Sequence, residues 1–506
     1  MQKVERVRRA SRARRFIRRL CFGEMPAGRR ALVLAIGFAL GSLVIGCGVA
    51  WFQMPSAGAS SGGTAEAASA APADREATAT AVVSAVAEDP ATFPLVVRPG
   101  QRYLEDVTGK PFLIHGDTAW SLIAELTRED VDRYLDDRHA RGFNTILVSL
   151  IEYHYSANAP ANAYDQQPFL KPGNYTTPND AYFAHADWVL RQAADKGFLV
   201  LLTPSYAGCC GDGWYEEMVT NGPVRLRQYG EYLGRRYRDF TNILWVHAGD
   251  ANPPRKDLVR AIAEGIREFD QQALHTAHGA HTAALDYWQD EPWLQVNNVY
   301  TYRSVYASAL EQYARPERLP FFLIEGIYEN EHEATEQLLR TQAYQAVLSG
   351  AAGHIFGNNP IWHFEGRGSY DGPVTWQEAL GSRGAQSMTH LRELFTSIRW
   401  WELEPDTDNT LLTGGLGSDH DRAVAARSTD RALALLYLPS SRDITVDLGQ
   451  LAGPEIAARW YDPANGRFSP ASGSPFEAAG PRRFMPESDT NSSGFDDWVL
   501  VLESRP

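Results

Sequence analysis

Cysteine is scarce in this sequence, and the few that are present cannot form a disulfide framework. Of four cysteines, Cys21 and Cys47 lie near the N-terminus, and only the adjacent pair Cys209 and Cys210 lies in the body of the chain. Small secreted scaffolds depend on several spaced pairs, so the sequence excludes that class. The adjacent pair forms either a strained vicinal disulfide or two reduced thiols, and in both cases we expect a structural role in a loop.

Several motifs that mark common enzyme classes are missing. No His-x-x-x-His or comparable spacing surrounds His115, His247 or His278, so we predict no metal site and no cofactor. No Gly-rich phosphate loop follows the first strand-like run, which argues against a dinucleotide-binding sheet. No Gly-x-Ser-x-Gly elbow precedes a helix-like stretch, so an esterase or a lyase ranks low among the enzyme hypotheses.

Positive charge is scarce after the first 30 residues. The chain has a formal charge of -14, yet its first 30 residues carry eleven Lys or Arg against Glu5 and Glu24, which leaves about -23 on the remainder. A body this acidic would repel nucleic acid, so we predict no nucleic-acid partner. The basic start is typical of a targeting segment rather than of a phosphate-binding arm.

One long apolar run, from Ala31 to Phe52, has no charge and is long enough to cross a bilayer as a helix. Its Arg-rich flank should remain in the cytoplasm. Within the run, Val44-Ile45-Gly46-Cys47 resembles a lipoprotein cleavage box, in which Cys47 would become the lipidated first residue. An uncleaved signal anchor is the main alternative, and simple secretion is a third. We therefore expect residues 1–54 to place the body outside the cytoplasm, attached to the membrane by this segment or its lipid unless the protein is secreted.

The next segment, residues 55–92, consists mainly of Ala, Ser, Gly, Thr and Pro. It cannot bury enough apolar surface to offset its chain entropy, so we predict a flexible tether. The whole chain has 506 residues, of which 44% are hydrophobic and 22% are charged. These values are ordinary for a soluble protein with one large domain and a smaller one.

Between residues 93 and 403, eight short apolar runs alternate with amphipathic stretches. This alternation predicts a (β/α)8 TIM barrel, with a doubly wound open sheet as the competing architecture. The predicted strands are Pro111–Gly116, Asn144–Leu150, Phe198–Pro204, Asn242–His247, Ala273–His278, Leu294–Tyr300, Pro320–Glu325 and Gly353–Gly357. The predicted helices are Thr127–Arg141, Asp180–Lys196, Pro223–Arg238, Pro254–Gln271, Glu331–Ser349 and Trp376–Ile398.

Residues 404–506 change to short strand-like runs separated by turn signals such as Asp462-Pro-Ala-Asn-Gly466. This pattern predicts a small antiparallel β-sandwich packed on the barrel. The predicted strands are Ala423–Arg427, Ala432–Leu438, Ile444–Leu448, Ala457–Tyr461 and Trp498–Leu502.

Two predicted barrel strands lead into a carboxylate. Asp250 follows the fourth strand and Glu325 ends the seventh, so both should lie at the C-terminal mouth, where barrels carry their chemistry. A lone acid in such a place is more often a helix cap or an exposed ion pair. Two acids on opposite sides of one mouth instead predict glycoside hydrolysis, with a separation of ~5 Å for retention and ~6.5–9.5 Å for inversion.

Other predicted strands end in aromatic or hydrogen-bonding side chains. Sugars present apolar C–H faces and polar edges, so a sugar site needs both kinds of group. Although any single member is more often a core residue, together they predict the substrate-binding set. Its members are Asp117, Trp120, Glu152, Tyr153, His278, Tyr300, Tyr302, Asn358 and Trp362.

Five stretches together resemble the apiosidase-like family of bacterial glycoside hydrolases. They are Phe112–Trp120, Arg141–Ile146, Pro204–Trp214, Trp245–Asp250 and Gly353–Asn359. The resemblance implies a TIM-barrel hydrolase that acts on plant-type polysaccharides, with apiose-containing pectin as the best-known substrate class. It also implies that Asp250 is the acid/base and Glu325 the nucleophile. His247-Ala248 departs from the family pattern, in which two glycines before the acid are commoner.

The tail resembles the β-domain that usually follows this barrel and carries a collagen-binding label. We discount the label, because it is a domain name and nothing in the tail indicates collagen chemistry. Our leading hypothesis is a monomeric, retaining, exo-acting O-glycosyl hydrolase. The alternative is a surface-tethered carbohydrate-binding protein that has lost catalysis.

Overall fold

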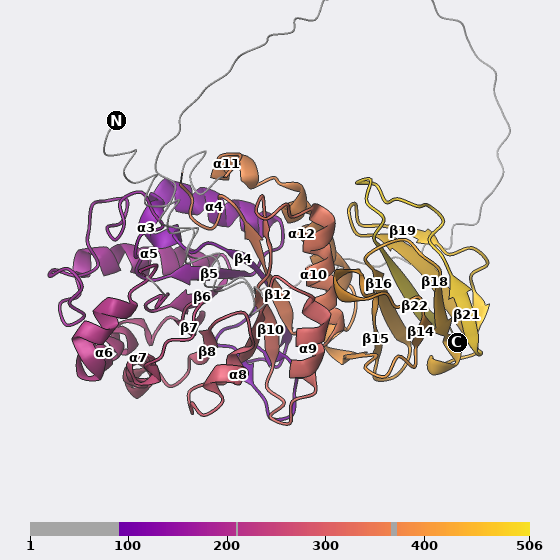
Figure 1. Cartoon of the computed structure of the whole chain (residues 1–506), viewed down its shortest axis with the longest axis horizontal. Coiled ribbons are helices and arrows are strands. Elements are labelled where there is room, and N and C mark those ends of the chain that lie inside the picture. The colour runs from indigo at the N-terminus through magenta and orange to yellow at the C-terminus, as the bar shows by residue number, and fades with distance from the viewer. Residues whose placement is uncertain (1–90, 209–210, 366–371, 506) are drawn as a thin grey trace, which may run out of the picture. The chain divides into compact units, whose positions relative to one another are not determined.

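The computed structural model describes residues 91–208, 211–365 and 372–505 (Figure 1). The predicted targeting segment, the tether up to residue 90 and the Cys209–Cys210 pair lie outside the described residues. In the part of the chain that the structure describes, no helix combines the length and apolar character needed to span a membrane.

Eight parallel strands form the predicted barrel, and every residue in them is buried. Burial on both faces explains why these segments are apolar runs rather than alternating sequences. The strands are β4 (Ile114–Thr118), β5 (Thr145–Ser149), β6 (Leu199–Thr203), β7 (Ile243–Ala248), β8 (Leu274–His278), β9 (Asn297–Tyr300), β10 (Phe321–Glu325) and β12 (Gly353–Asn358). The predicted fold class is therefore confirmed.

The barrel has a seam between β8 and β9. Strand pairing runs β8-β7-β6-β5-β4-β12-β10-β9, and no β8–β9 ladder is present among the described residues. Instead, Asn298 Nδ2 donates to the Ala277 carbonyl oxygen at 2.7 Å and to Thr276 Oγ1 at 2.9 Å. The backbone N–H groups of Gln295 and Val296 both donate to the His275 carbonyl oxygen. One side-chain amide and a loop thus replace a strand ladder at this joint.

Helices surround the sheet in the expected order (Figure 1). They include α3 (Leu122–Glu125), α4 (Arg128–Ala140), α5 (Asp180–Asp195), α6 (Tyr215–Tyr237), α7 (Lys256–Phe269), α8 (Ala284–Trp288), α9 (Val305–Tyr313), α10 (Glu336–Leu348), α11 (Trp376–Ala379) and α12 (Arg383–Thr396). The predicted N-cap Thr127 accepts the Asp130 N–H. Helix α6 is interrupted at Gly222 (φ 70°), where the backbone is not helical, so its second part begins at Pro223 as predicted and a shorter helical part precedes it.

A short three-stranded sheet precedes the barrel. It consists of β1 (Val96–Val97), β2 (Leu104–Glu105) and β3 (Pro111–Phe112). Leu104 and Phe112 belong to the same buried cluster as barrel-interior residues such as Ile114 and Leu201. The first predicted strand, Pro111–Gly116, is therefore split between β3 and β4. Because β3 lies just before β4, this small sheet packs at the N-terminal end of the barrel, opposite the mouth.

The C-terminal residues form two antiparallel sheets, as predicted. The larger sheet contains β13 (Leu403–Pro405), β15 (Val424–Ser428), β16 (Leu433–Leu438), β22 (Trp498–Arg505), β18 (Glu455–Asp462), β19 (Arg467–Pro470) and β20 (Phe476–Glu477). The smaller one contains β14 (Leu412–Gly414), β17 (Ile444–Asp447) and β21 (Pro481–Phe484). One face of the larger sheet covers the smaller sheet, and the other joins the core of the barrel helices.

A buried ion pair joins this β-domain to the barrel. Arg340 of α10 makes two hydrogen bonds of 2.7 Å to Asp497, and both side chains are fully buried. The Tyr437 hydroxyl donates to the same carboxylate at 2.9 Å, and the Tyr437 ring stacks on Tyr344 of α10. Burial alone lowers the pKa of Arg340, but Asp497 outweighs this effect and raises it, so the guanidinium remains charged.

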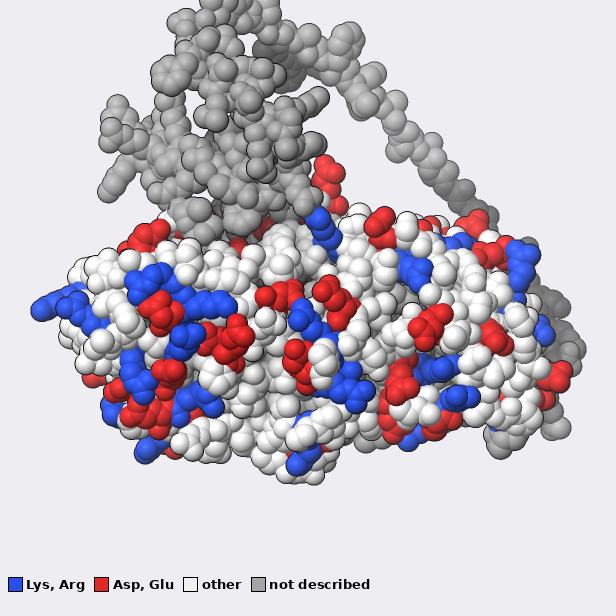
Figure 2. Space-filling model, turned by 60° about the horizontal axis from the view of Figure 1, so that its bottom comes forward, with Lys and Arg blue, Asp and Glu red and all other residues white. Residues whose placement is uncertain are grey.

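Acidic and basic side chains are intermixed on the face drawn in Figure 2. Exposed pairs of this kind join the outer helices, as where Arg227 of α6 contacts Glu264 and Glu268 of α7. Such pairs contribute little to stability, typically below about 1 kcal/mol. The buried pair of Arg340 and Asp497 is therefore the stronger link in the fold.

Candidate active site

Asp250 lies at the mouth of the barrel, two residues beyond β7. The turn that carries it begins at Ala248, whose φ of 68° falls in the left-handed region that a non-glycine residue rarely adopts. The Tyr206 hydroxyl, from the loop after β6, donates a hydrogen bond to Asp250 Oδ1. A strained turn that holds an acid at a barrel mouth is typical of a functional site.

Glu325 is the last residue of β10, and an irregularity in that strand aims it. Phe322 and Ile324 fill the barrel interior, so strict alternation would direct Glu325 outward. The pairing register shifts between Leu323 and Glu325, which is the effect of a β-bulge. The side chain therefore turns toward His278 Nε2, which lies 2.7 Å from Oε2, while the Tyr302 hydroxyl donates to Oε1 at 3.0 Å.

His278 is the fully buried partner of Glu325. Its Nδ1 lies 3.2 Å from the Gly279 carbonyl oxygen, so both ring nitrogens face acceptors, an arrangement that suits an imidazolium ion. Burial alone lowers the pKa of His278, but the hydrogen bond and charge of Glu325, with a smaller contribution from Asp250, raise it above its ordinary value. The two predicted acids thus act on the same histidine.

This pairing predicts a pH effect on stability. A histidine whose pKa is raised on folding stabilises the protein fully below its unfolded pKa, near 6.5, and that stabilisation is lost as pH rises through the folded pKa. His278→Gln retains a donor for Glu325 but cannot titrate. We expect the wild type to lose more thermal stability than His278→Gln as the pH rises above about 6.5, measured by calorimetry. Parallel curves for the two proteins would contradict the charged pair.

Trp120 lies between the partners of the two acids. Its ring centroid is 5.7 Å from that of Tyr206, which bonds Asp250, and 5.7 Å from that of His278, which bonds Glu325. Its Nε1 donates to the Tyr328 hydroxyl at 3.3 Å. The structure therefore gathers one group of predicted site residues around an aromatic ring. The group comprises Asp250, Glu325, His278, Tyr300, Tyr302 and Trp120.

A second set of aromatic side chains surrounds this group. Tyr155 contacts Trp362 with ring centroids 5.4 Å apart and Tyr206 with centroids 6.3 Å apart. Trp362 Nε1 donates to Glu331 at 2.9 Å, and the Tyr153 ring packs against Trp214. These contacts connect the loops that follow β5, β6, β10 and β12 at the mouth.

The structure places the predicted site residue Asp117 outside the group around Trp120. Its side chain is fully buried and points from β4 toward α4, where it pairs with Arg138 at 2.9 Å and accepts the Tyr134 hydroxyl. Burial raises the pKa of Asp117 to about 6, although Arg138 and Tyr134 oppose this shift. Asp117 therefore fastens a barrel strand to its helix.

Glu152 and Asn358 likewise make their hydrogen bonds outside this group. Glu152 is 3% exposed, and its oxygens accept the Ser121 hydroxyl and the backbone N–H groups of Tyr153 and Tyr155. Asn358 is fully buried, and its Nδ2 donates to Glu329. Both residues shape loops of the mouth from behind its aromatic side chains.

Tyr206, Tyr155, Tyr328 and Glu331 belong to the site but were not predicted from the sequence. Tyr206 is the second residue after the predicted third strand, and Tyr155 the second after Tyr153. The rule that a barrel places its functional groups just after strands would have included them. Glu331 carries no such signal, because its link to Trp362 joins two loops that are distant in the sequence.

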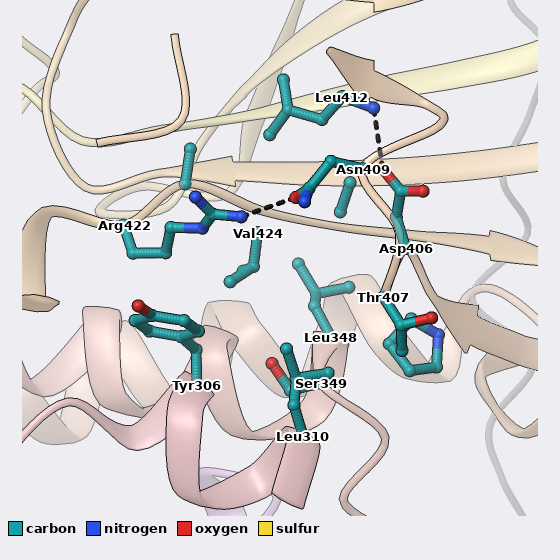
Figure 3. Close-up of a pocket in the computed structure, with 13 residues that line it drawn as sticks. Tyr306, Leu310, Leu348, Ser349, Asp406, Thr407, Asn409, Leu412, Arg422 and Val424 are labelled. Carbon is teal, nitrogen blue, oxygen red and sulfur yellow. Dashed lines mark hydrogen bonds between the residues drawn. The ribbon is translucent and has the colours of Figure 1, made fainter. Parts of the chain in front are cut away.

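A separate hollow lies where the β-domain meets α9 and α10 (Figure 3). Arg422 donates to Asn409 beside Tyr306, and the Asp406 carboxylate accepts the Leu412 N–H. These polar groups hold a turn in place, so the hollow has no acid poised for proton transfer. Among residues 91–208, 211–365 and 372–505, no group of three His, Cys, Asp or Glu side chains is arranged to hold a metal ion.

Comparison with known proteins identifies the barrel. Residues 98–402, more than half of the chain, match the family described as "Apiosidase-like, catalytic domain". The chain belongs to this family. The apiosidase-like barrel is followed at residues 405–503 by a match to the "Putative collagen-binding domain of a collagenase". None of the curated proteins compared with the chain matches it.

Solved structures agree with this apiosidase-like assignment. One described as a glycoside hydrolase is 26% identical with a TM-score of 0.72, covering 81% of this chain and 96% of its own. A glycoside hydrolase of family 5 from Bacteroides vulgatus ATCC 8482 is 25% identical with the same TM-score, covering 81% and 93%. The predicted enzyme class is therefore confirmed, and this apiosidase-like chain is a glycosyl hydrolase.

Proposed function

We propose that this enzyme is a retaining, exo-acting glycosidase that releases a terminal sugar, with apiose as the leading case, from a plant-type polysaccharide. The observation that carries the proposal is the state of Glu325, which receives a hydrogen bond on each carboxylate oxygen and faces the Asp250 side of the mouth across Trp120. Donors on both oxygens hold the carboxylate in place for the attack that a nucleophile makes.

In the first step, a Glu325 oxygen attacks the anomeric carbon as the glycosidic C–O bond breaks. The glycosidic oxygen keeps the electron pair of the broken bond and takes a proton from Asp250. The leaving alcohol and the glycosyl ester are therefore both neutral. Tyr302 and His278 hold Glu325 in position for this attack. Trp120 provides an apolar surface for the C–H face of the sugar.

In the second step, water attacks the anomeric carbon of the glycosyl ester. Asp250 accepts a proton from that water, and Glu325 leaves as a carboxylate. Two inversions at one carbon restore the configuration of the substrate. His278 and Tyr302 then contact the Glu325 carboxylate again.

The aromatic contacts on one side of the mouth support exo action. The Tyr155–Trp362 contact and the Trp362–Glu331 hydrogen bond join loops that would otherwise flank a through-going chain. A terminal sugar needs to enter from one side only, so this arrangement suits a chain end better than an internal linkage. The family name supports apiose as the sugar.

The non-catalytic carbohydrate-binding alternative has no specific support at the site. A binding surface would need aromatic platforms but not an acid hydrogen-bonded on both oxygens. A large polysaccharide substrate agrees with the expected place of the body outside the cytoplasm, with attachment through Cys47 or an uncleaved anchor. We also expect the enzyme to act as a monomer.

The proposal predicts both a product and its configuration. Apiose-rich pectin fragments and a panel of other plant and bacterial polysaccharides should release monosaccharide when incubated with the purified full chain. Proton NMR of the first product formed from an aryl apioside should show the anomer of the substrate, before mutarotation. The opposite anomer would indicate inversion, with Glu325 acting as a base toward water. Sugar binding by calorimetry without any release would favour the non-catalytic alternative.

A further inference from the structure

Tyr206 is tied to Asp250 by more than one contact. Its hydroxyl donates to Asp250 Oδ1, and its ring packs edge-on against Trp120 with centroids 5.7 Å apart. The adjoining backbone is fixed as well, since the Ala207 N–H donates to the Ala248 carbonyl oxygen at 2.9 Å. The loops after β6 and β7 therefore form one rigid unit that carries both side chains.

The turn before Asp250 is built to admit the Tyr206 ring. A Cβ atom on Gly249 would lie 3.1 Å from ring carbons of Tyr206 and 3.0 Å from the Gly208 nitrogen, closer than side chains normally approach. A side chain at residue 249 would therefore push the ring away from the acid. The strained conformation of Ala248 and the missing side chain of Gly249 thus both serve the contact between Tyr206 and Asp250.

This geometry can hold the Asp250 carboxyl group in both of its protonation states. A tyrosine hydroxyl can donate to a carboxylate, and it can equally donate to the carbonyl oxygen of the protonated acid. Tyr206 can therefore remain bonded to Oδ1 in both protonation states and keep the carboxyl plane in one orientation.

We propose that Tyr206 is a positioning residue that orients the Asp250 carboxyl group for proton transfer to the glycosidic oxygen. This inference rests on the proposed role of Asp250 as acid/base. Tyr206 exchanges no proton with the substrate. It holds the carboxyl plane while Asp250 donates a proton in the first step and accepts one from water in the second.

The test compares leaving groups that need a proton with leaving groups that do not. The probes are methyl apioside, whose alkoxide must be protonated, and 2,4-dinitrophenyl apioside, whose phenolate leaves without help. Because positioned proton transfer contributes about 10²–10⁴-fold, Tyr206→Phe should lower kcat/KM for the methyl glycoside by roughly tenfold or more and for the dinitrophenyl glycoside by less than about threefold. If wild type releases another sugar in the panel, the same pair of glycosides is made from that sugar.

Two further variants distinguish a failure of the Tyr206 role from a failure of the Asp250 acid/base assignment. Tyr461→Phe loses a comparable hydroxyl hydrogen bond, to the His390 carbonyl oxygen at 2.7 Å, and should affect both probes equally or not at all. Asp250→Ala should show the same leaving-group selectivity as Tyr206→Phe, but larger. Equal losses on both probes in Tyr206→Phe, with Asp250→Ala selective, would overturn the role of Tyr206 alone. An unselective Asp250→Ala would overturn the acid/base assignment, and the inference with it.

Discussion

Replacing Glu325 with Gln should lower kcat by roughly three orders of magnitude or more, because the variant loses the charge that attacks the anomeric carbon. Gln has nearly the shape of Glu and can still accept from His278 and engage Tyr302, the two partners of Glu325. The melting temperature should therefore change little at pH 8. Kinetics on an aryl apioside test the expected loss of kcat, and a calorimetric scan tests the expected melting temperature. Activity like that of the wild type would contradict the assignment of Glu325 as the nucleophile.

Azide can separate the roles of the two acids. In Glu325→Ala, azide can enter the vacated space and attack the anomeric carbon directly, which gives a glycosyl azide of inverted configuration. In Asp250→Ala, azide instead attacks the glycosyl ester, so the product retains the configuration of the substrate. Exchanged outcomes would mean that the two assignments must be exchanged.

Asp497→Ala should lower the free energy of unfolding by about 3–5 kcal/mol. The variant leaves the fully buried Arg340 guanidinium without its counter-ion and removes the acceptor of the Tyr437 hydroxyl. The same helix, α10, also holds the loop after Glu325, since Gln342 Oε1 accepts the Ile327 N–H at 2.8 Å. Activity should therefore decline together with stability. Denaturant unfolding of the full chain, followed by fluorescence, measures the first effect.

The matched control for this experiment is an exposed ion pair. Glu264→Ala removes one partner of Arg227, both of them substantially exposed, and should change the free energy of unfolding by less than about 1 kcal/mol. The double variant Arg340→Met with Asp497→Leu should recover most of the loss, because buried ion pairs are commonly replaceable by apolar side chains. Equal effects of Asp497→Ala and Glu264→Ala would mean that the buried pair does not hold the β-domain.

The barrel could be predicted from the sequence because all eight strands are buried on both faces. Such strands appear in the sequence as short apolar runs, and the residues that follow them lie at the mouth of the barrel. Helices α8 and α9 were not predicted, since α8 spans only Ala284–Trp288 and α9 only Val305–Tyr313. Segments so short carry little periodicity.

The direction of individual side chains could not be predicted in the same way. In β4, a Cβ on Gly116 would meet Ile355 inside the barrel, whereas the neighbouring Asp117 faces α4. When both faces of a strand are buried, hydrophobicity does not reveal which residues point inward. Glu325 faces the mouth because of a β-bulge that no sequence pattern predicts. The positions of the two acids after their strands could therefore be predicted from the sequence, whereas the direction of the Asp117 side chain could not.

The seam between β8 and β9 changes what the presence of Glu325 can tell about related chains. Glu325 extends from β10 to His278 on β8, past β9, so it spans the joint that lacks a strand ladder. A relative that only binds sugar would still gain from keeping this glutamate, because it closes the barrel. Asp250 does not join strands in this way, because β6 and β7 beside it already form a strand ladder. Loss of the acid at residue 250, rather than at 325, is therefore the better indicator that a related chain has lost hydrolase activity.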